Sequence, residues 1–101
     1  MIKVIIERHT KAGQDISLLL KELRVAAIMH YRGYVTSETL VSTQDSSIII
    51  TVSVWQSLED WERWATSETR AKLNQQIEPL LLEKPKVRTF RILATDYIVD
   101  Y

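Results

Sequence analysis

The sequence predicts a single α+β domain of ferredoxin-like order β-α-β-β-α-β, with one antiparallel sheet and both helices on the same face. Two observations lead to this fold class. The spacing of apolar residues switches between a period of two, typical of strands, and a period of about 3.6, typical of helices. In addition, 101 residues with 46% hydrophobic content and two glycines suit one compact domain spanning residues 1–101. This element order in this length is a recognised supersecondary arrangement.

The first part of the chain predicts a strand followed by a helix. Residues 2–8 are rich in β-branched side chains, which favour a strand. The helix is expected to open at Gln14 or Asp15, because apolar residues then recur at three- and four-residue steps and form one stripe. Gly33 is expected to end this helix, after Tyr31 or Arg32.

The middle of the chain predicts a β-hairpin. Residues 33–43 are rich in threonine and valine with a period near two, and residues 48–55 form a second β-branched run. The intervening segment 44–47, Gln-Asp-Ser-Ser, has the composition of a turn.

The second half predicts a helix with a break and then a last strand. Ser57 is followed by two acidic residues, so it reads as a helix N-cap and the helix should begin at Leu58. Ser67 is a second cap candidate within this helix, and Pro79 ends the helical pattern. Residues 86–95 predict the last strand.

The strand composition also predicts a homodimer. A sheet covered on one face should alternate apolar and polar residues, yet residues 48–50 are three consecutive isoleucines and Ile5 adjoins Ile6. Because both helices are needed on the first face, the second face is expected to pack against the same face of another subunit. The apolar tail at 97–101 is expected to dock across this dimer.

Charge and composition exclude several classes of function. Thirteen basic and thirteen acidic residues cancel, which argues against a nucleic-acid partner and against a polybasic membrane patch. The absence of cysteine excludes a disulfide framework and a thiolate nucleophile. The first residues lack the pattern of a signal peptide, and no apolar run is long enough to span a membrane. We therefore expect a soluble, cytoplasmic protein.

All the tryptophan in the chain lies at the junction between the second hairpin strand and the following helix. Trp55, Trp61 and Trp64 fall within ten residues. Such a cluster indicates either a packed corner of the core or the wall of an apolar cleft. Trp61 continues the apolar stripe of the helix, whereas Trp64 lies about 60° away from it, so Trp64 is the strongest candidate for the cleft.

The run GYVTSETL at 33–40, then VWQS at 54–57 and Trp61, Trp64, Ser67 and Arg70, resembles the antibiotic biosynthesis monooxygenase domain family, the dimeric α+β barrels. The resemblance spans nearly the whole chain. It implies a dimer whose two sheets pack into a barrel, with a ligand cleft in each subunit between sheet and helices. Some members of that family oxidise polyketide-type aromatic substrates with molecular oxygen and no cofactor, and others cleave haem.

Membership of the haem-degrading branch of that family is disfavoured, because this chain lacks two of the residues that those enzymes use. Those enzymes use a tryptophan, an iron-ligating histidine ten residues later and an asparagine on the first strand. Trp64 matches the tryptophan, but Asn74 replaces the histidine and Glu7 replaces the asparagine. A carboxamide is a poor ligand for haem iron, so only His30 or His9 remains as an alternative donor.

The resemblance therefore implies a cofactor-independent monooxygenase acting on a small aromatic, quinol or polyketide-like substrate. Such catalysis needs a base to deprotonate the substrate and donors to hold an oxyanion. Glu7 and His30 are the candidate catalytic bases, and Tyr34, Trp64 and Asn74 are the candidate ligand-binding residues. No cofactor and no metal site are predicted. The alternative is a non-enzymatic dimeric module that binds a small hydrophobic ligand.

Overall fold

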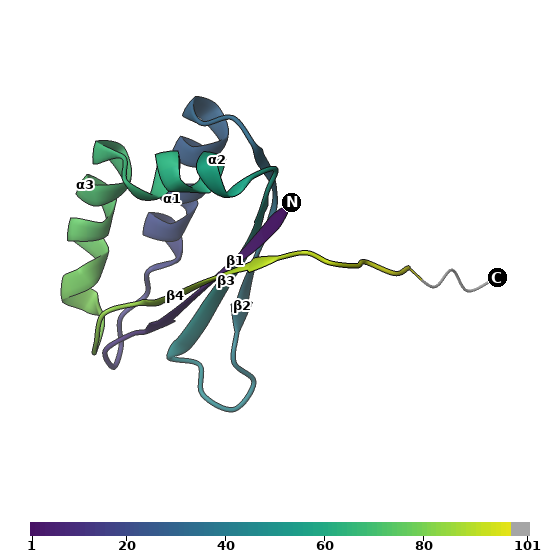
Figure 1. The fold of residues 1–101 in the computed structure, drawn as a ribbon. Helices are drawn as coiled ribbons and strands as arrows, with labels where there is room; N and C mark the ends of the chain where they lie inside the picture. The colour runs from purple at the N-terminus through teal and green to yellow at the C-terminus, as the bar shows by residue number, and fades with distance from the viewer. Residues whose placement is uncertain (98–101) are drawn as a thin grey trace.

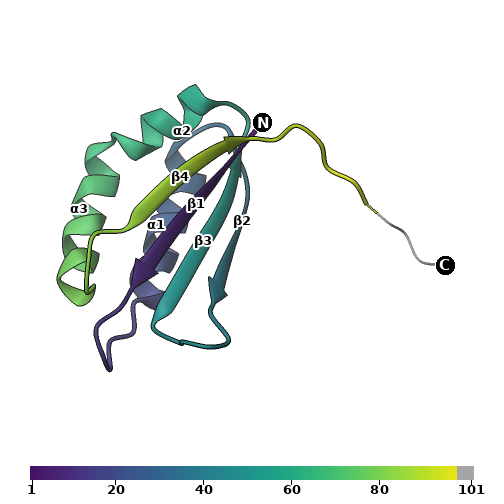
Figure 2. The ribbon, with the colours of Figure 1, turned by 60° about the horizontal axis from the view of Figure 1, so that its bottom comes forward.

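The computed structural model describes residues 1–97, which fold into a four-stranded sheet with the helices on one face (Figures 1 and 2). All neighbouring strands are antiparallel, in the order β2-β3-β1-β4, which confirms the ferredoxin-like fold. The elements are β1 (Ile2–His9), α1 (Ser17–His30), β2 (Tyr34–Val41), β3 (Ile48–Trp55), α2 (Leu58–Ala65), α3 (Glu68–Ile77), the short 3₁₀ turn η1 (Glu78–Leu80) and β4 (Lys86–Arg91).

Several element boundaries differ from those expected; α1 ends at His30 and β2 spans Tyr34–Val41, and the largest differences are at the start of α1 and the end of β4. Helix α1 begins at Ser17, because the Asp15 carboxylate accepts a hydrogen bond from the Ser17 backbone N–H at 2.9 Å and holds the preceding chain in a turn. Strand β4 ends at Arg91 rather than at residue 95. Within residues 1–97 its only strand neighbour is β1, which begins at Ile2, and the Ile92 N–H donates to the Met1 carbonyl at 3.1 Å. Beyond that point the described chain has no strand partner.

The predicted break in the second helical segment is confirmed, and both serine caps are present. Ser57 Oγ accepts from the Asp60 backbone N–H at 3.1 Å, so α2 begins at Leu58. Ser67 Oγ accepts from the Arg70 N–H at 3.1 Å and starts α3. The second cap turns the chain between α2 and α3, so that the two helices lie over different parts of the sheet (Figure 2).

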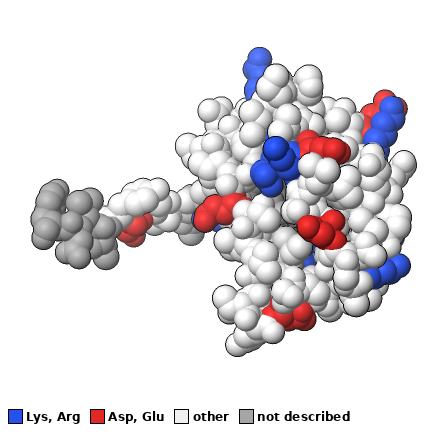
Figure 3. Space-filling view, turned by 180° about the vertical axis from the view of Figure 1, so that it is seen from behind, with Lys and Arg blue, Asp and Glu red and all other residues white. Residues whose placement is uncertain are grey.

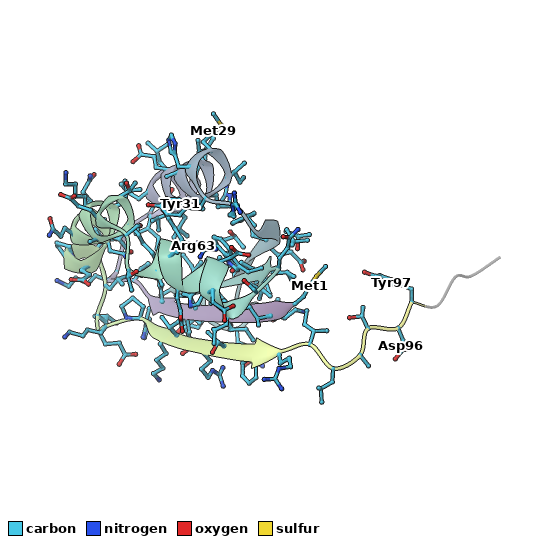
Figure 4. All side chains as sticks on the ribbon, turned by 45° about the horizontal axis from the view of Figure 1, so that its top comes forward. Met1, Met29, Tyr31, Arg63, Asp96 and Tyr97 are labelled. Atoms are coloured by element: carbon cyan, nitrogen blue, oxygen red, sulfur yellow. The ribbon has the colours of Figure 1, made fainter. Side chains whose placement is uncertain are left out.

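The core lies between the helices and the sheet face that they cover, here called the inner face. Figure 4 shows side chains of both layers filling this space, whereas Met29 points outward from α1. The buried apolar residues come from β1, β3, all three helices and two flanking positions, Ile16 before α1 and Leu81 after η1; they are Ile2, Val4, Ile6, Ile16, Leu20, Leu23, Ala27, Trp55, Trp61, Trp64, Ile77 and Leu81. Thus the tryptophan corner predicted from the sequence is part of this core.

The opposite sheet face, here called the outer face, carries no helix within residues 1–97 (Figures 1 and 2). Ile5 on β1 pairs with Val52 on β3, and both side chains are only half-buried. Phe90 on β4 lies on the same face and is 47% exposed. The outer face therefore has an open apolar strip at its centre, flanked by charged residues such as Glu7, Glu38 and Arg88.

The side of the molecule seen in Figure 3 shows no large field of one sign. Figure 3 shows basic and acidic side chains scattered among uncharged ones on the side that it presents. Beyond β4 the chain runs away from the body, and Asp96 and Tyr97 lie clear of it (Figure 4). The predicted docking of the tail concerns residues 97–101, of which 98–101 lie outside the described residues. No helix in the described part of the chain is long and apolar enough to cross a membrane.

Gly33 links α1 to β2 at a point where only glycine fits. Its φ is +90°, and an added Cβ would overlap the Asp60 carboxyl group. The Gly33 carbonyl accepts from the Gln56 N–H at 2.8 Å. Asp60 is held in place by the Ser57 hydroxyl, which donates to it at 2.9 Å, and by an ion pair with Arg63. This contact ties the α1–β2 turn to the start of α2.

We predict that Gly33→Ala lowers the free energy of unfolding by more than about 2 kcal/mol, because a positive φ costs about 1–2 kcal/mol and the overlap with Asp60 adds to it. Gly13→Ala is the matched control, since Gly13 has φ +75° but open space around its Cβ position. Urea denaturation of both variants measures the difference. Equal losses in the two variants would show that the contact with Asp60 is unimportant.

Candidate functional site

A pocket opens between the inner face of the sheet and helices α1, α2 and α3. Its empty space is about 450 Å³ including the open mouth, of which only about 40 Å³ admits the centre of a water molecule. The smaller of these two volumes describes the usable interior, so the pocket is narrow. Its lining residues are Ile6, Arg8, Leu20, Leu23, Arg24, Ala27, Tyr34, Thr39, Thr51, Ser53, Trp55, Trp61, Trp64 and Arg70.

Aromatic rings form one end of the pocket and hold one another in place. Trp55 packs edge-to-face against Trp61 at 5.9 Å and against Tyr34 at 5.1 Å between ring centroids. Trp64 makes the same kind of contact with Tyr31 at 5.0 Å. The Trp55 indole N–H donates to Ser53 Oγ at 3.2 Å. Edge-to-face pairs of this kind rigidify a wall beyond simple burial.

Strand β1 places a charged side chain at the inner end of the pocket. Side chains alternate along a strand, so Arg8 follows Val4 and Ile6 onto the inner face. Arg8 is only 2% exposed. One terminal nitrogen donates to Thr51 Oγ1 at 3.4 Å, and its Nε is buried with no hydrogen-bond partner in the described structure.

Two further guanidinium groups reach the same pocket. Arg70 lies in the first turn of α3 behind the Ser67 cap, and its Cζ sits 5.3 Å from the centroid of the Trp61 ring. Arg24 on α1 donates to Thr39 Oγ1 at 3.4 Å in an exposed position near the mouth. None of the lining residues is acidic. Within residues 1–97, none of these three arginines forms an ion pair.

Burial without a counter-ion makes the Arg8 charge unfavourable. Burial, the larger cause, and the neighbouring Arg70 guanidinium together lower the pKa of Arg8 to about 10. Burial also lowers the pKa of Arg70. For Arg8 the shift corresponds to destabilisation on the order of 3 kcal/mol. Because the folded-state pKa lies below that of the unfolded chain, this penalty is fully present below pH 10 and fades only above it.

The structure brings together two of the five site residues predicted from the sequence. Tyr34 and Trp64 both line the pocket. Glu7 lies on the outer face of the sheet, opposite to Arg8, with its carboxylate 4.0 Å from the Lys86 amine. The alternation of β1 explains this placement, because adjacent residues of a strand point to opposite faces.

The other two predicted residues lie on helices away from the pocket lining. His30 occupies the exposed last turn of α1, and Asn74 is half-buried on α3. The sequence reading did not assign a role to Arg8 or Arg70. The available signal was the two-residue register of Ile2, Val4, Ile6 and Arg8, which places a charge in a core-facing position.

The described residues contain no cluster of three or more histidine, aspartate or glutamate side chains placed to hold a metal ion. Comparison with known protein families identifies residues 1–76 with the antibiotic biosynthesis monooxygenase model. The chain belongs to the antibiotic biosynthesis monooxygenase family. Members of this family are typically dimeric. No curated protein matches the chain significantly.

Solved structures show the same fold at low sequence identity. A structure described as an antibiotic biosynthesis monooxygenase superposes with a TM-score of 0.79 at 17% identity, covering 93% of this chain and 100% of that one. A conserved protein from Methanosarcina mazei gives 0.79 at 14% identity, with coverage of 89% and 90%. A protein from Shewanella oneidensis gives 0.73 at 19% identity, with coverage of 88% and 87%.

We predict that Arg8→Met stabilises the ligand-free protein by about 1–2 kcal/mol, a rise in melting temperature of roughly 5–10 °C. Methionine keeps the packed stem but removes the unpaired charge. Arg32→Met, at an exposed position, is the control and should change stability by less than about 0.5 kcal/mol. A fall in the melting temperature of Arg8→Met, measured by calorimetry, would mean that Arg8 is a structural residue.

Proposed function

We propose that this member of the antibiotic biosynthesis monooxygenase family is a cofactor-independent monooxygenase of a small aromatic or quinol-type substrate. The observation that carries the proposal is the pocket itself. It combines a wall of aromatic rings with two guanidinium groups, Arg8 and Arg70, at positions without acidic neighbours. An apolar ring suits the tryptophan wall, and a developing oxyanion suits the guanidinium groups.

The chemistry requires a substrate anion that gives an electron to dioxygen. An acidic C–H or phenol O–H of the substrate loses its proton, one electron passes to O₂, and the resulting radical and superoxide combine to a peroxide. For an activated CH₂ group, loss of one water from the hydroperoxide leaves a carbonyl. One CH₂ and one O₂ thus give one C=O and one H₂O.

In this scheme the cations of the pocket favour the deprotonated substrate. Arg8 and Arg70 lower the pKa of an acidic group held near them, because an opposite charge in a poorly solvated site stabilises the ionised form. Tyr34 and Trp64 add a phenol O–H and an indole N–H as donor types on the same lining. Water accepts the proton, since the lining holds no carboxylate or imidazole.

The dimensions of the pocket support independence from an organic cofactor. Only about 40 Å³ of the interior admits the centre of a water molecule. A small ring and dioxygen require modest widening of this space, whereas a flavin or a haem would require separation of the helices from the sheet. The long side chain of Met29 on α1 does not occupy this space, because it is 68% exposed to solvent.

We also propose that the protein is a homodimer formed through the outer sheet face. This face carries half-buried apolar residues at its centre and exposed Phe90 and Leu40 nearer its edges. Stacking it against the same face of a second chain would cover these residues, and family membership supports this assembly.

A second candidate function is a non-enzymatic dimeric module that binds a small ligand. The absence of a carboxylate or imidazole from the pocket lining favours it, because no residue of these types is placed to act as a general base. Ligand binding without oxygen uptake would identify this function.

The enzymatic proposal predicts oxygen uptake with hydroquinones or anthrone-type compounds, measured with an oxygen electrode. Arg8→Met should lower kcat by about a hundredfold or more, the usual loss when one oxyanion donor is removed. Arg32→Met should retain the wild-type rate. No uptake across the panel would contradict the proposal.

Glu7→Gln and His30→Ala test the two bases predicted from the sequence. Because neither side chain lines the pocket, we expect oxygen uptake comparable to that of the wild type. A large loss in either variant would place the reaction elsewhere in the molecule.

Val52→Lys should convert the dimer into a monomer in sedimentation experiments, because burying an ammonium group at the interface removes its hydration and costs several kcal/mol. Val52 lies near the centre of the outer face, opposite Ile5 and Glu38. Gln75→Lys on the exposed side of α3 adds the same charge and should remain dimeric. A wild-type monomer at micromolar concentration would refute the assembly.

A further inference from the structure

The pocket holds more positive charge than its own residues neutralise. Arg8 is 2% exposed, its Nε has no hydrogen-bond partner in the described structure, and Arg70 lies close enough to disfavour its charge. Buried charges in proteins are normally paired or neutralised. A buried guanidinium that lines a pocket and has no ion-pair partner among the described residues is therefore placed to pair with an anion.

Two of the three arginines, Arg24 and Arg8, differ in their exposure. Arg24 is half-buried and reaches Thr39, which is exposed, whereas Arg8 is buried beside Thr51. Positive charge thus extends from the mouth to the interior. Each guanidinium makes a single long hydrogen bond or none to the protein side chains described, so most of its N–H groups remain available.

From this arrangement we infer that the pocket binds a small organic anion, a carboxylate carried on a single apolar ring, with Arg8 and Arg70 holding the carboxylate oxygens and the tryptophan wall holding the ring. The inference names the substrate class of the proposed enzyme and in that sense rests on the proposed function. Its decisive test measures binding and requires no turnover.

The geometry favours a carboxylate over a phosphate. A planar carboxylate presents two oxygens that match the fork of a guanidinium. A phosphate is bulkier and carries more charge into a narrow space whose lining is mainly Leu, Ile, Ala and Trp. The tryptophan wall has no role in binding a free phosphate, whereas it accounts for the apolar part of an aromatic acid.

Benzoate, benzamide and inorganic phosphate are the probes for calorimetric titration, with tryptophan fluorescence as a second readout. Benzoate should bind at least about tenfold more tightly than benzamide, as expected for one charge-assisted interaction. Arg8→Met and Arg70→Met should each lose this preference while still binding benzamide as the wild type does. Arg32→Met should keep it. Because Arg8→Met is expected to be more stable than the wild type, unfolding does not confound the result.

Three outcomes would overturn the inference. They are equal affinity for benzoate and benzamide, phosphate binding as tight as benzoate binding, and an unchanged preference for benzoate in both Arg8→Met and Arg70→Met. Binding at an unrelated surface lysine or arginine would give the last of these results.

Oxygen uptake with two matched hydroquinones separates this inference from the proposed function. Faster uptake with a hydroquinone carboxylate than with methylhydroquinone supports both. Preferential binding of the carboxylate without uptake of oxygen supports the anion site and refutes the monooxygenase. Equal uptake with both compounds supports the monooxygenase and refutes the anion site.

Discussion

The alternation of side chains along β1 is the constraint on which the site depends. β1 is a central strand with β3 on one side and β4 on the other, so its register is bound by two ladders. That register sends Val4, Ile6 and Arg8 under the helices and Glu7 to the outer face. A slip of one residue would exchange the two sets and put a carboxylate in the pocket. The positive character of the site therefore follows from strand pairing rather than from local sequence.

The second determinant of the site is the capped turn between α2 and α3. Ser67 ends one helical direction and starts another, and Arg70 follows in the first turn of α3. There its guanidinium lies over Trp61 and next to Arg8. Two cations held close together in a poorly solvated place destabilise the folded chain. Such a conflict between stability and local chemistry is typical of functional sites.

The two faces of the sheet differ in what they carry. The inner face carries the core and the pocket, whereas the outer face offers apolar side chains that the described chain does not cover. This division explains how 101 residues can provide both the proposed assembly surface and the proposed ligand site. It also keeps the proposed dimer contact and the pocket on opposite sides of one sheet, so that changes to one need not disturb the other.

The sequence was sufficient to predict the order of the elements, both serine caps and the hairpin, because periodicity and capping are local properties. The sequence also predicted an important corner at the three tryptophans but left open whether they pack in the core or line a cleft; in the structure they do both. The sequence did not predict where α1 starts, because the Asp15 side chain forms a turn there, or where β4 ends, because that depends on the length of the neighbouring β1.

The sequence predicted only part of the pocket lining. Tyr34 and Trp64 belong to the wall, but residue type and the family resemblance suggested Glu7 and His30 as bases, and the structure places both outside the pocket. By itself the sequence determined the fold and the aromatic wall. Only the tertiary structure decided that Arg8 and Arg70 meet there without an acidic partner, because the distance between side chains from β1 and α3 depends on how the helices pack on the sheet.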